Sequence, residues 1–320
     1  MLFKVAALAA LSASVKEASH GLAAAAQHVA ACMILCSFEI LLPSENSGEW
    51  ILYVRAAMEV IQRAQLGNQS DYGDNVGLVD WVYYHNSLSR FTLSHWRHRY
   101  LAVGSTDTGT GPVTQIAHLL ANLSAQAPLP QSRTHTILNT LSEICDVLLD
   151  PSDPRSQDVA YRNRLKALEW KVDNFPTWSS TTAVSDKPGE ELEFTLQLYK
   201  TATRIYLTRA SQNPLEPMAN LDSSIDWAYT GALQHGNCRH FFPLLIIACE
   251  ARTDEQRAAV LNLINRTEKK GYVRSMMAFR SQVQSFWKQY DLHADSDLIL
   301  NYLGLMKAVI SSNTALPSYA

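Results

Sequence analysis

The chain has 320 residues, of which 47% are hydrophobic and 18% are charged. These proportions are typical of a globular protein with a sizeable core and exclude a disordered or fibrous chain. The formal net charge of -3 excludes a general attraction to nucleic acid or to an anionic membrane surface. No run reaches the ~20 consecutive apolar residues of a spanning helix, so the sequence predicts no membrane segment.

The first predicted helices cover residues 2–18 and 22–42. Lys4 and the apolar run after it resemble a signal peptide only weakly, because Ser12 and Ser14 interrupt the run. An alanine-rich stretch follows, and alanine favours helix. The sequence therefore predicts a helical N-terminal region in a protein that is not secreted.

Glycine and proline, 13 and 12 in number, cluster between apolar segments. All-β chains instead place turn residues at roughly every eight to twelve positions. The predicted fold class is all-α, an irregular multi-helix domain of stacked helix pairs, with residues 1–320 as a single domain. Further helices are predicted over residues 48–66, 77–87, 113–124, 133–149, 156–172, 190–211, 222–234, 240–250, 254–270, 273–289 and 296–310.

Two of these helices carry clear local signals. Apolar residues recur at three- and four-residue steps from Phe194 to Tyr206, which predicts an amphipathic helix with one buried stripe. Thr253 followed by Gln256 has the spacing of a capping box, in which each side chain bonds to the backbone N–H of the other residue. This motif predicts the start of the helix over 254–270.

The cysteines indicate a reducing compartment. They are five in number, and no Cys-x-x-Cys pair occurs among them. Most lie among apolar residues, which is typical of buried free thiols. The sequence therefore predicts a cytoplasmic or nuclear protein. The cysteines are Cys32, Cys36, Cys145, Cys238 and Cys249.

The sequence has no standard nucleotide-binding or hydrolase motif. The glycine-rich segment Gly104–Gly111 lacks the Lys-Ser/Thr ending of a phosphate-binding loop, and no strand is predicted before it. Gly-x-Ser-x-Gly and His-Glu-x-x-His are both absent, which argues against the common serine hydrolases and zinc peptidases. We therefore expect no cofactor.

Two histidine-containing segments have the residue types of a metal site without its spacing. His95 and His98 lie among arginines with no nearby Cys, Asp or Glu, and we interpret this segment as a polar helix face or loop. Cys238 and His240 have no second pair of ligands close by in the sequence. The sequence predicts no metal.

Aromatic residues gather in a few segments, and core packing explains most of them. Because buried Trp and Tyr also need a polar partner, such clusters suit a cavity for an apolar ligand with a few oxygens. We select aromatic or polar residues beside apolar stretches as candidate ligand-binding residues. They are Trp81, Tyr84, His85, Tyr206, Trp227, His235, His240 and Phe241.

Several segments contain motifs of packing residues. Phe38–Leu42 is rich in leucine and contains a Glu, Gly48–Ala57 begins with a Trp, and Leu78–Tyr84 is aromatic. Tyr199–Arg209 is close to the pattern Ala-x-x-Ile-Tyr-Leu-x-Arg, and is the most specific of the set.

Two later segments complete the series. Phe242–Ala251 is similar to Trp-Pro-Leu-x-x-x-Gly-Cys-Glu-Ala, with Phe for Trp and Ala for Gly, and Val283–Asp291 resembles Val-Trp-x-x-x-Asp. Read in order, the motifs resemble the fungal-specific transcription factor domain, the helical region C-terminal to the zinc cluster of many fungal regulators.

This resemblance implies an all-helical domain that regulates activity. In some sterol-responsive members of the family, the domain binds its lipid in a pocket between helices. The resemblance assigns no catalytic residues, because the motifs are packing motifs. The closely spaced cysteines of a zinc cluster do not occur after Met1, so the sequence predicts no direct DNA binding.

Two functions remain open at this stage. The first is a stand-alone, ligand-responsive regulator in fungal secondary metabolism that binds a terpenoid, sterol or polyketide and acts with a protein partner or a second copy. The second is a cofactor-free cyclase of the Diels–Alder type, in which an aromatic pocket holds a polyene and a His or Tyr polarises a carbonyl. A zinc cluster in a longer chain, before Met1, also remains open.

Overall fold

The computed structural model of the chain is all-α throughout the ranges that it describes, which confirms the predicted fold class. The helices predicted over 2–18 and 113–124, and the segment Gly104–Gly111, lie outside the described residues. The described residues are 21–41, 48–66, 76–96, 133–176, 188–213, 219–233, 240–269, 273–293, 301–313 and 316–319.

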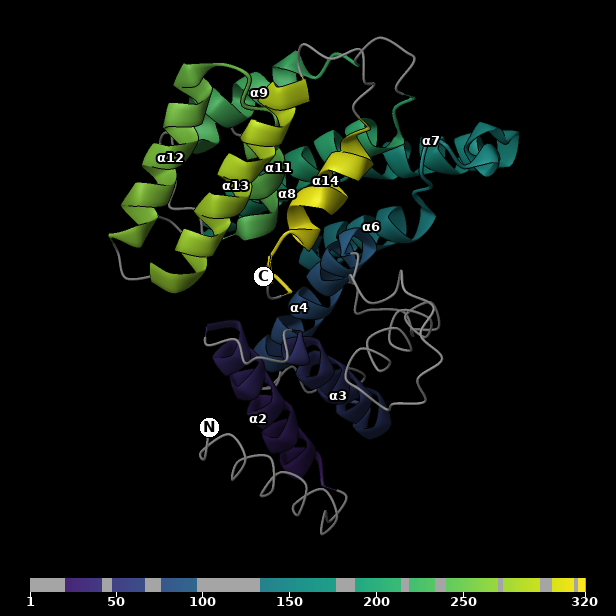
Figure 1. The fold of residues 1–320 in the computed structure, drawn as a ribbon. Helices are drawn as coiled ribbons and strands as arrows, with labels where there is room; N and C mark the ends of the chain where they lie inside the picture. The colour runs from purple at the N-terminus through teal and green to yellow at the C-terminus, as the bar shows by residue number, and fades with distance from the viewer. Residues whose placement is uncertain are drawn as a thin grey trace, which may run out of the picture.

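Helices α2 (Leu22–Leu41) and α3 (Glu49–Ala64) pack side by side and form a layer at one end of the molecule (Figure 1). Helix α4 (Val76–His95) covers this layer. Their buried apolar side chains form one core, which we call the N-terminal cluster. It comprises Val29, Cys32, Met33, Leu35, Cys36, Trp50, Ile51, Tyr53, Val54, Ala57, Met58, Ile61, Val79, Val82, Tyr83, Leu93 and Leu316.

Helix α2 has the length and composition of a membrane-crossing helix, with 20 residues and a mean hydropathy of 1.6. Its inner face, however, buries the polar side chains of His28 and Glu39 and packs against α3. Buried ionisable groups on a face that contacts another helix of the same protein are a feature of a core helix. The inner face of α2 therefore belongs to the N-terminal cluster, whereas Ile34 and Leu41 on this helix are 63% and 53% exposed.

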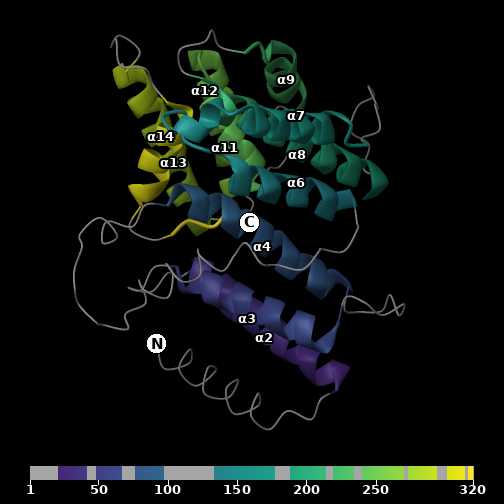
Figure 2. The same cartoon turned by 90° about the vertical axis from the view of Figure 1, so that its right-hand side faces the viewer.

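The remaining helices enclose a second core, which we call the C-terminal cluster. It comprises the buried apolar residues between Leu88 and Ile310, except Leu93, together with Tyr319. In Figure 2, α6, α8 and α7 lie above α4, on the side away from α2 and α3, and these three helices contact one another. The helices are α6 (Arg133–Val147), α7 (Val159–Asp173), α8 (Pro188–Ser211), α9 (Asp222–Trp227), α11 (Phe241–Cys249), α12 (Asp254–Glu268), α13 (Val273–His293) and α14 (Tyr302–Ser311).

Both local signals in the sequence are confirmed. The amphipathic stripe of α8 is buried through Leu198, Ala202 and Tyr206. At the start of α12, the Thr253 hydroxyl accepts a bond from the backbone N–H of Gln256. The Gln256 side chain accepts in return from the backbone N–H of Thr253, which completes the capping box.

Two predicted helix boundaries are wrong, the end at residue 87 and the start at residue 296. The helix predicted over 77–87 continues to His95 as α4, because Phe91 contacts the C-terminal cluster and Leu93 the N-terminal cluster. A helix buried on two sides lacks the polar face that marks its length in a sequence. The helix predicted over 222–234 is α9 followed by a π-helical turn, and α14 begins at Tyr302, with Asn301 as its N-cap.

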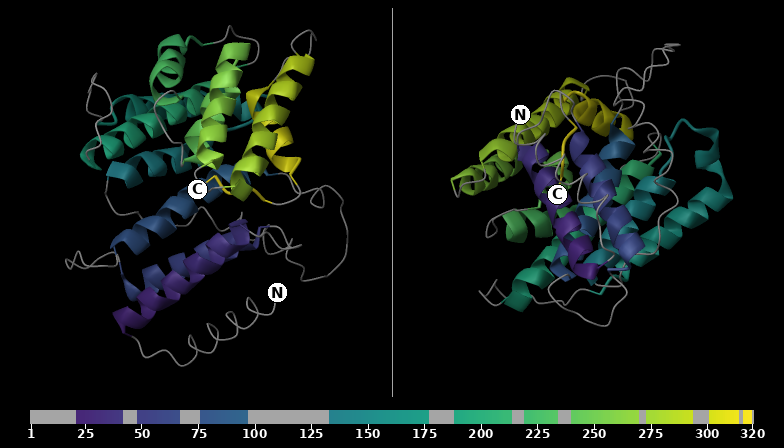
Figure 3. Two further views of the ribbon diagram at one scale, coloured as in Figure 1. Left: turned by 90° about the vertical axis from the view of Figure 1, so that its left-hand side faces the viewer. Right: turned by 90° about the horizontal axis from the view of Figure 1, so that it is seen from below.

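The two clusters meet at a short segment near the end of the chain, Leu316–Tyr319. Figure 3 shows the C-terminus between the α2–α3 layer and α13. Leu316 is buried in the N-terminal cluster and Tyr319 in the C-terminal cluster. Because its two ends lie in different cores, we call residues 316–319 the bridging segment.

Candidate functional site

A cavity of about 230 Å³ lies where the bridging segment meets both clusters. Its walls come from the end of α2, the start of α3, the start of α11, the middle of α13 and the bridging segment. Apolar and aromatic side chains cover most of the surface: Ile40, Trp50, Phe241, Phe279, Leu316 and Tyr319. The polar side chains are Glu39, Gln282, Asn313 and Ser318.

Hydrogen bonds hold the bridging segment in the cavity wall. The Trp50 indole donates to the carbonyl oxygen of Leu316 over 3.0 Å. The Tyr319 hydroxyl donates to Oε1 of Gln282 over 3.0 Å, and the Tyr319 carbonyl accepts from the backbone N–H of Phe242 over 3.2 Å. One short segment therefore connects α3, α13 and α11 around the same cavity.

The structure distributes the candidate ligand-binding residues over several places. Phe241 lines the cavity, with its ring centroid 5.2 Å from that of Phe279. Trp227 packs against Phe194 at a centroid distance of 6.1 Å. His235 lies outside the described residues. Among the candidates that the structure describes, Phe241 alone lies in the wall of this cavity.

Tyr84, Tyr199 and His240 form a polar group that is separate from the cavity wall. The two tyrosine hydroxyls are 2.9 Å apart, and each lies 3.3 Å from Nδ1 of His240. Tyr84 comes from α4, Tyr199 from α8, and His240 directly precedes α11. Three segments far apart in sequence therefore bring three proton-carrying groups together.

Trp81 and His85 lie next to this group on α4. Nδ1 of His85 donates to the carbonyl oxygen of Trp81 over 3.0 Å, and the His85 ring lies 5.6 Å from that of Tyr84. Burial lowers the pKa of His85, although its bond to Trp81 acts in the opposite direction. The imidazole of His85 is therefore held neutral beside Tyr84 at neutral pH.

Tyr206 is a core residue and is only 1% exposed. Its hydroxyl lies 2.8 Å from Nε2 of His95, which is equally buried. The interpretation of His95 as part of a polar helix face or loop is therefore wrong. Helix α4 directs its side chain into the core, beside residues of the C-terminal cluster. Burial, with a contribution from Lys307, lowers the pKa of His95 to about 3. Within the described ranges, no three His, Cys, Asp or Glu side chains form a group that could hold a metal.

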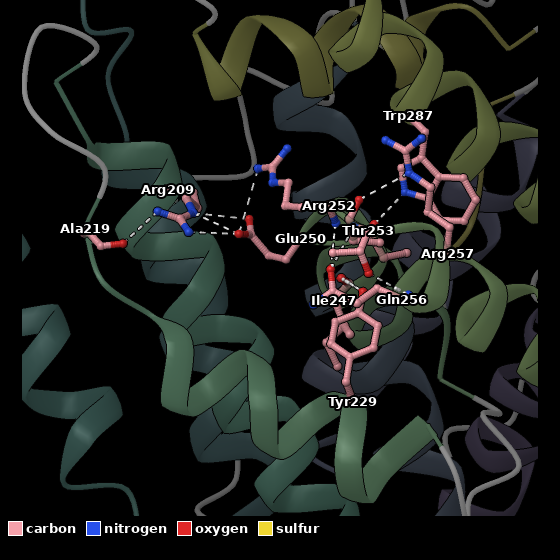
Figure 4. Close-up of polar contacts among 12 residues, drawn as sticks. Arg209, Ala219, Tyr229, Ile247, Glu250, Arg252, Thr253, Gln256, Arg257 and Trp287 are labelled. Carbon is pink, nitrogen blue, oxygen red and sulfur yellow. Dashed lines mark hydrogen bonds and ion pairs between the residues drawn. The ribbon is translucent and has the colours of Figure 1, made fainter. Parts of the chain in front are cut away.

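A buried ion pair joins α8 to the end of α11 (Figure 4). Nε and Nη2 of Arg209 donate to Oε2 of Glu250 over 3.1 and 2.9 Å, and Nη1 donates to the carbonyl oxygen of Ala219 over 3.0 Å. The side chains of Arg209 and Glu250 are 7% and 1% exposed. Several charge-assisted bonds satisfy both ions in a site that excludes water.

The last motif packs on the same region. The Trp287 indole donates to the carbonyl oxygen of Ala248 over 2.8 Å. Arg257 forms two bonds with Asp291, of 2.8 and 2.6 Å. Its guanidinium lies 5.5 Å from the Trp287 ring centre, and Figure 4 shows these two side chains close together. The segment Phe242–Ala251 therefore contacts both Tyr199–Arg209 and Val283–Asp291, which the sequence singled out separately.

The buried contacts among these motifs hold together an all-helical protein with a cavity between its two cores. The chain matches the fungal specific transcription factor domain over residues 1–307, and it belongs to this family. It is 31% identical over 296 residues to a protein of Pestalotiopsis fici named transcription factor iacI. That match covers 92% of this chain and 72% of the relative. No solved structure matches the chain significantly.

Sequence reasoning missed most of the cavity wall. Trp50 and Gly48 belong to a motif noted in the sequence, and Gly48 has φ 104, which strains residues other than glycine. The motif Gly48–Ala57 was therefore the signal in the sequence that could have pointed to this wall. No pattern marks Gln282 or the bridging segment, because their positions depend on how distant segments pack.

We predict that Arg209→Met lowers the free energy of unfolding by about 3 kcal/mol, because it leaves the buried Glu250 carboxylate with only the longer contact to Arg252, at 3.9 Å. The double variant Arg209→Met/Glu250→Leu should lose less, since it removes both charges. Urea denaturation measures both values.

The control is the half-exposed pair of Lys171 and Glu143, with an Nζ–Oε2 distance of 2.6 Å. Lys171→Met should cost at most about 1 kcal/mol. A cost for Arg209→Met as small as this would show that the buried pair does not stabilise the fold.

A second prediction concerns acid. In the unfolded chain His95 binds a proton below about pH 6.5, whereas the folded protein keeps it neutral down to about pH 3. Stability is therefore lost as the pH falls from about 6.5 towards 3, by about 1.4 kcal/mol per pH unit. Between pH 7 and 5, the unfolding free energy should fall by about 2 kcal/mol more in the wild type than in His95→Gln.

Tyr206→Phe is the control for this experiment, because it removes the hydrogen-bond partner of His95 but leaves the imidazole buried. This variant should keep the acid sensitivity of the wild type. Equal pH slopes for the wild type and His95→Gln, from urea denaturation at both pH values, contradict the prediction.

Proposed function

We propose that the chain is the ligand-responsive regulatory domain of a fungal transcription factor, and that an apolar small molecule binds in the cavity between the two clusters. Membership of the family supports the regulatory role. The observation that carries the proposal is the position of the cavity, whose wall includes both cores and the bridging segment.

This position supports a simple mechanism. A ligand in the cavity touches the bridging segment, which bonds to Trp50 of α3 and to Gln282 of α13. Binding therefore favours whichever arrangement of the α2–α3 layer and the C-terminal helices fits the ligand better. A ligand shifts such an equilibrium only by its difference in affinity for the two arrangements.

The family also supports a site of action. A regulator of transcription works in the nucleus, and the unpaired thiols of the described cysteines Cys32, Cys36, Cys145 and Cys249 agree with a reducing compartment. We propose a nuclear or cytoplasmic protein that acts with a protein partner or a second copy, in fungal secondary metabolism. The similarity to transcription factor iacI supports the transcriptional role.

A matched pair of variants on α13 tests the proposal. Ala278 is exposed and lines the cavity, so Ala278→Trp should fill its rim without disturbing either core. Met277, the next residue, is 63% exposed and is not part of the cavity wall. Met277→Trp therefore adds the same side chain to the same helix outside the cavity.

Each variant is incubated with an organic extract of a fungal culture, purified again and examined by native mass spectrometry. We expect a bound small molecule on the wild type and on Met277→Trp, and at least about tenfold less on Ala278→Trp, because the indole excludes the ligand. Equal loading of both variants, or no bound molecule on the wild type, contradicts the proposal.

The group formed by Tyr84, Tyr199 and His240 favours a second candidate function, a cofactor-free cyclase. Two hydroxyls and an imidazole within 3.3 Å can donate a hydrogen bond to a carbonyl and lower the barrier of a Diels–Alder-type ring closure. The reaction would need a polyene held close to these donors.

This alternative predicts conversion without a change of mass. Protein is added to an extract of a fungal strain deleted for the gene, and the products are separated by chromatography and mass spectrometry. A cyclase should convert an accumulated precursor to an isomer, and Tyr199→Phe with His240→Phe should slow the conversion at least about 100-fold. Release of an unchanged bound metabolite contradicts the cyclase.

A further inference from the structure

We propose that Tyr84, Tyr199 and His240 form a binding site for one ferric ion, in which two phenolate oxygens and an imidazole nitrogen coordinate the metal. This inference goes beyond the proposed function, because the three residues lie outside the wall of the cavity. It follows from the distances among the three ligand atoms, from the hydrogen-bonding capacity of the imidazole nitrogen and from the chemistry of the ligands.

The three ligand atoms form a nearly equilateral triangle. The hydroxyl oxygens of Tyr84 and Tyr199 are 2.9 Å apart, and each lies 3.3 Å from Nδ1 of His240. Metal bonds to nitrogen and oxygen ligands are about 2.0–2.1 Å long, which separates neighbouring ligand atoms by about 2.9 Å in an octahedron and about 3.4 Å in a tetrahedron. All three distances lie in this range, so one ion fits at bonding distance from all three atoms.

Hydrogen bonding among the three groups does not account for the geometry around Nδ1 of His240. An imidazole nitrogen carries either one lone pair or one proton, so it forms one good hydrogen bond. Here two hydroxyls approach it at equal distances of 3.3 Å, and both distances exceed the ~2.7–3.2 Å that is usual for such a bond. A metal ion binds the lone pair and both oxygens at the same time.

The fold orients the three rings toward a common point. The rings come from α4, α8 and the N-cap of α11, and their planes make angles of 77°, 76° and 72° with one another. Tyr199 is only 2% exposed and stacks on Phe242 at a centroid distance of 6.2 Å. Tyr84 and His240 keep part of their surface exposed, so an ion reaches the group from the side of these two residues.

The sequence around His240 predicts no metal, because Cys238 is the one other ligand type close by. The structure supplies two tyrosines that are 41 and 156 residues away along the chain. Within the ranges that the structure describes, no group of three His, Cys, Asp or Glu side chains could hold a metal. A metal site in these ranges therefore depends on other ligand atoms, and phenolate oxygen provides them.

The ligand types select the metal. Phenolate is a hard, anionic oxygen ligand that favours a small ion of high charge such as Fe³⁺, whereas zinc is held mostly by Cys and His. Binding releases the two hydroxyl protons to solvent, and the neutral imidazole supplies the lone pair of its Nδ1. Two negative charges then face the three positive charges of the ion. A bound ferric ion thus removes the protons that the candidate cyclase would use.

The site is coupled to the cavity through α11. His240 directly precedes Phe241, which lines the cavity. A ferric ion that ties His240 to α4 and α8 also fixes the start of α11 and with it the position of Phe241. Iron is therefore an input to the regulatory domain that is separate from the ligand of the cavity.

Ferric citrate added to the purified full chain tests the site. Ferric phenolate absorbs visible light by charge transfer from ligand to metal, so we expect a visible band that ferric citrate alone lacks. The band should saturate at one iron per chain, and native mass spectrometry should show the same ratio. Tyr84→Phe and Tyr199→Phe should each weaken iron binding at least about 100-fold, since loss of an outer-shell group alone costs about 10- to 100-fold. The double variant should lose the band.

Tyr229→Phe is the matched control, because it removes a hydroxyl that donates to the carbonyl oxygen of Ile247 over 3.0 Å, outside the group. This variant should bind iron like the wild type. Ala278→Trp, at the rim of the cavity, should also keep the band, since it changes no ligand of the metal.

The outcomes separate this inference from the proposed function. No visible band on the wild type overturns the inference, whether or not the variants fold. A band that the double variant keeps indicates an adventitious ion only and overturns it as well. Zinc that binds the wild type more tightly than iron, and that the double variant does not bind, overturns the choice of metal. The proposed function fails on different results, namely the absence of a bound molecule from fungal extracts or equal loading of the two Trp variants.

Discussion

The buried pair of Arg209 and Glu250 is the constraint on which the rest of the C-terminal cluster depends. Each ion is nearly inaccessible to water, so α8 and the end of α11 cannot separate without leaving Arg209 unpaired and Glu250 with only the longer contact to Arg252, at 3.9 Å. Arg209 also binds the carbonyl of Ala219 and so holds the chain that leads to α9. The sequence motifs that contain these two residues are packing motifs, because they determine how α8 and α11 pack around the ion pair.

Helix α11 transmits this constraint to the cavity. Its far end is held by Glu250, and its first turn is held by the bond between the backbone N–H of Phe242 and the carbonyl of Tyr319. Phe241, at the start of the same helix, lines the cavity. A helix held at both ends keeps the aromatic wall in place, so the cavity depends on an ion pair at the opposite end of α11.

The sequence predicted well those features that depend on neighbouring residues. The capping box of α12 and the buried stripe of α8 need contacts only within one helix and one face. The sequence-based prediction failed for a helix that is buried on two sides. The α4 helix was predicted too short because Phe91 and Leu93 enter different cores, and His95 was misplaced for the same reason.

The sequence by itself determined the all-α class, the family and the motifs that meet around Arg209 and Glu250, because helix periodicity and motif spacing are local. Only the tertiary structure decided where those motifs meet and which side chains surround the cavity. Glu39, Gln282 and Tyr319 come from segments up to 280 residues apart, since 319 − 39 = 280. Their proximity results from the packing of two cores against the bridging segment, and no local pattern encodes it.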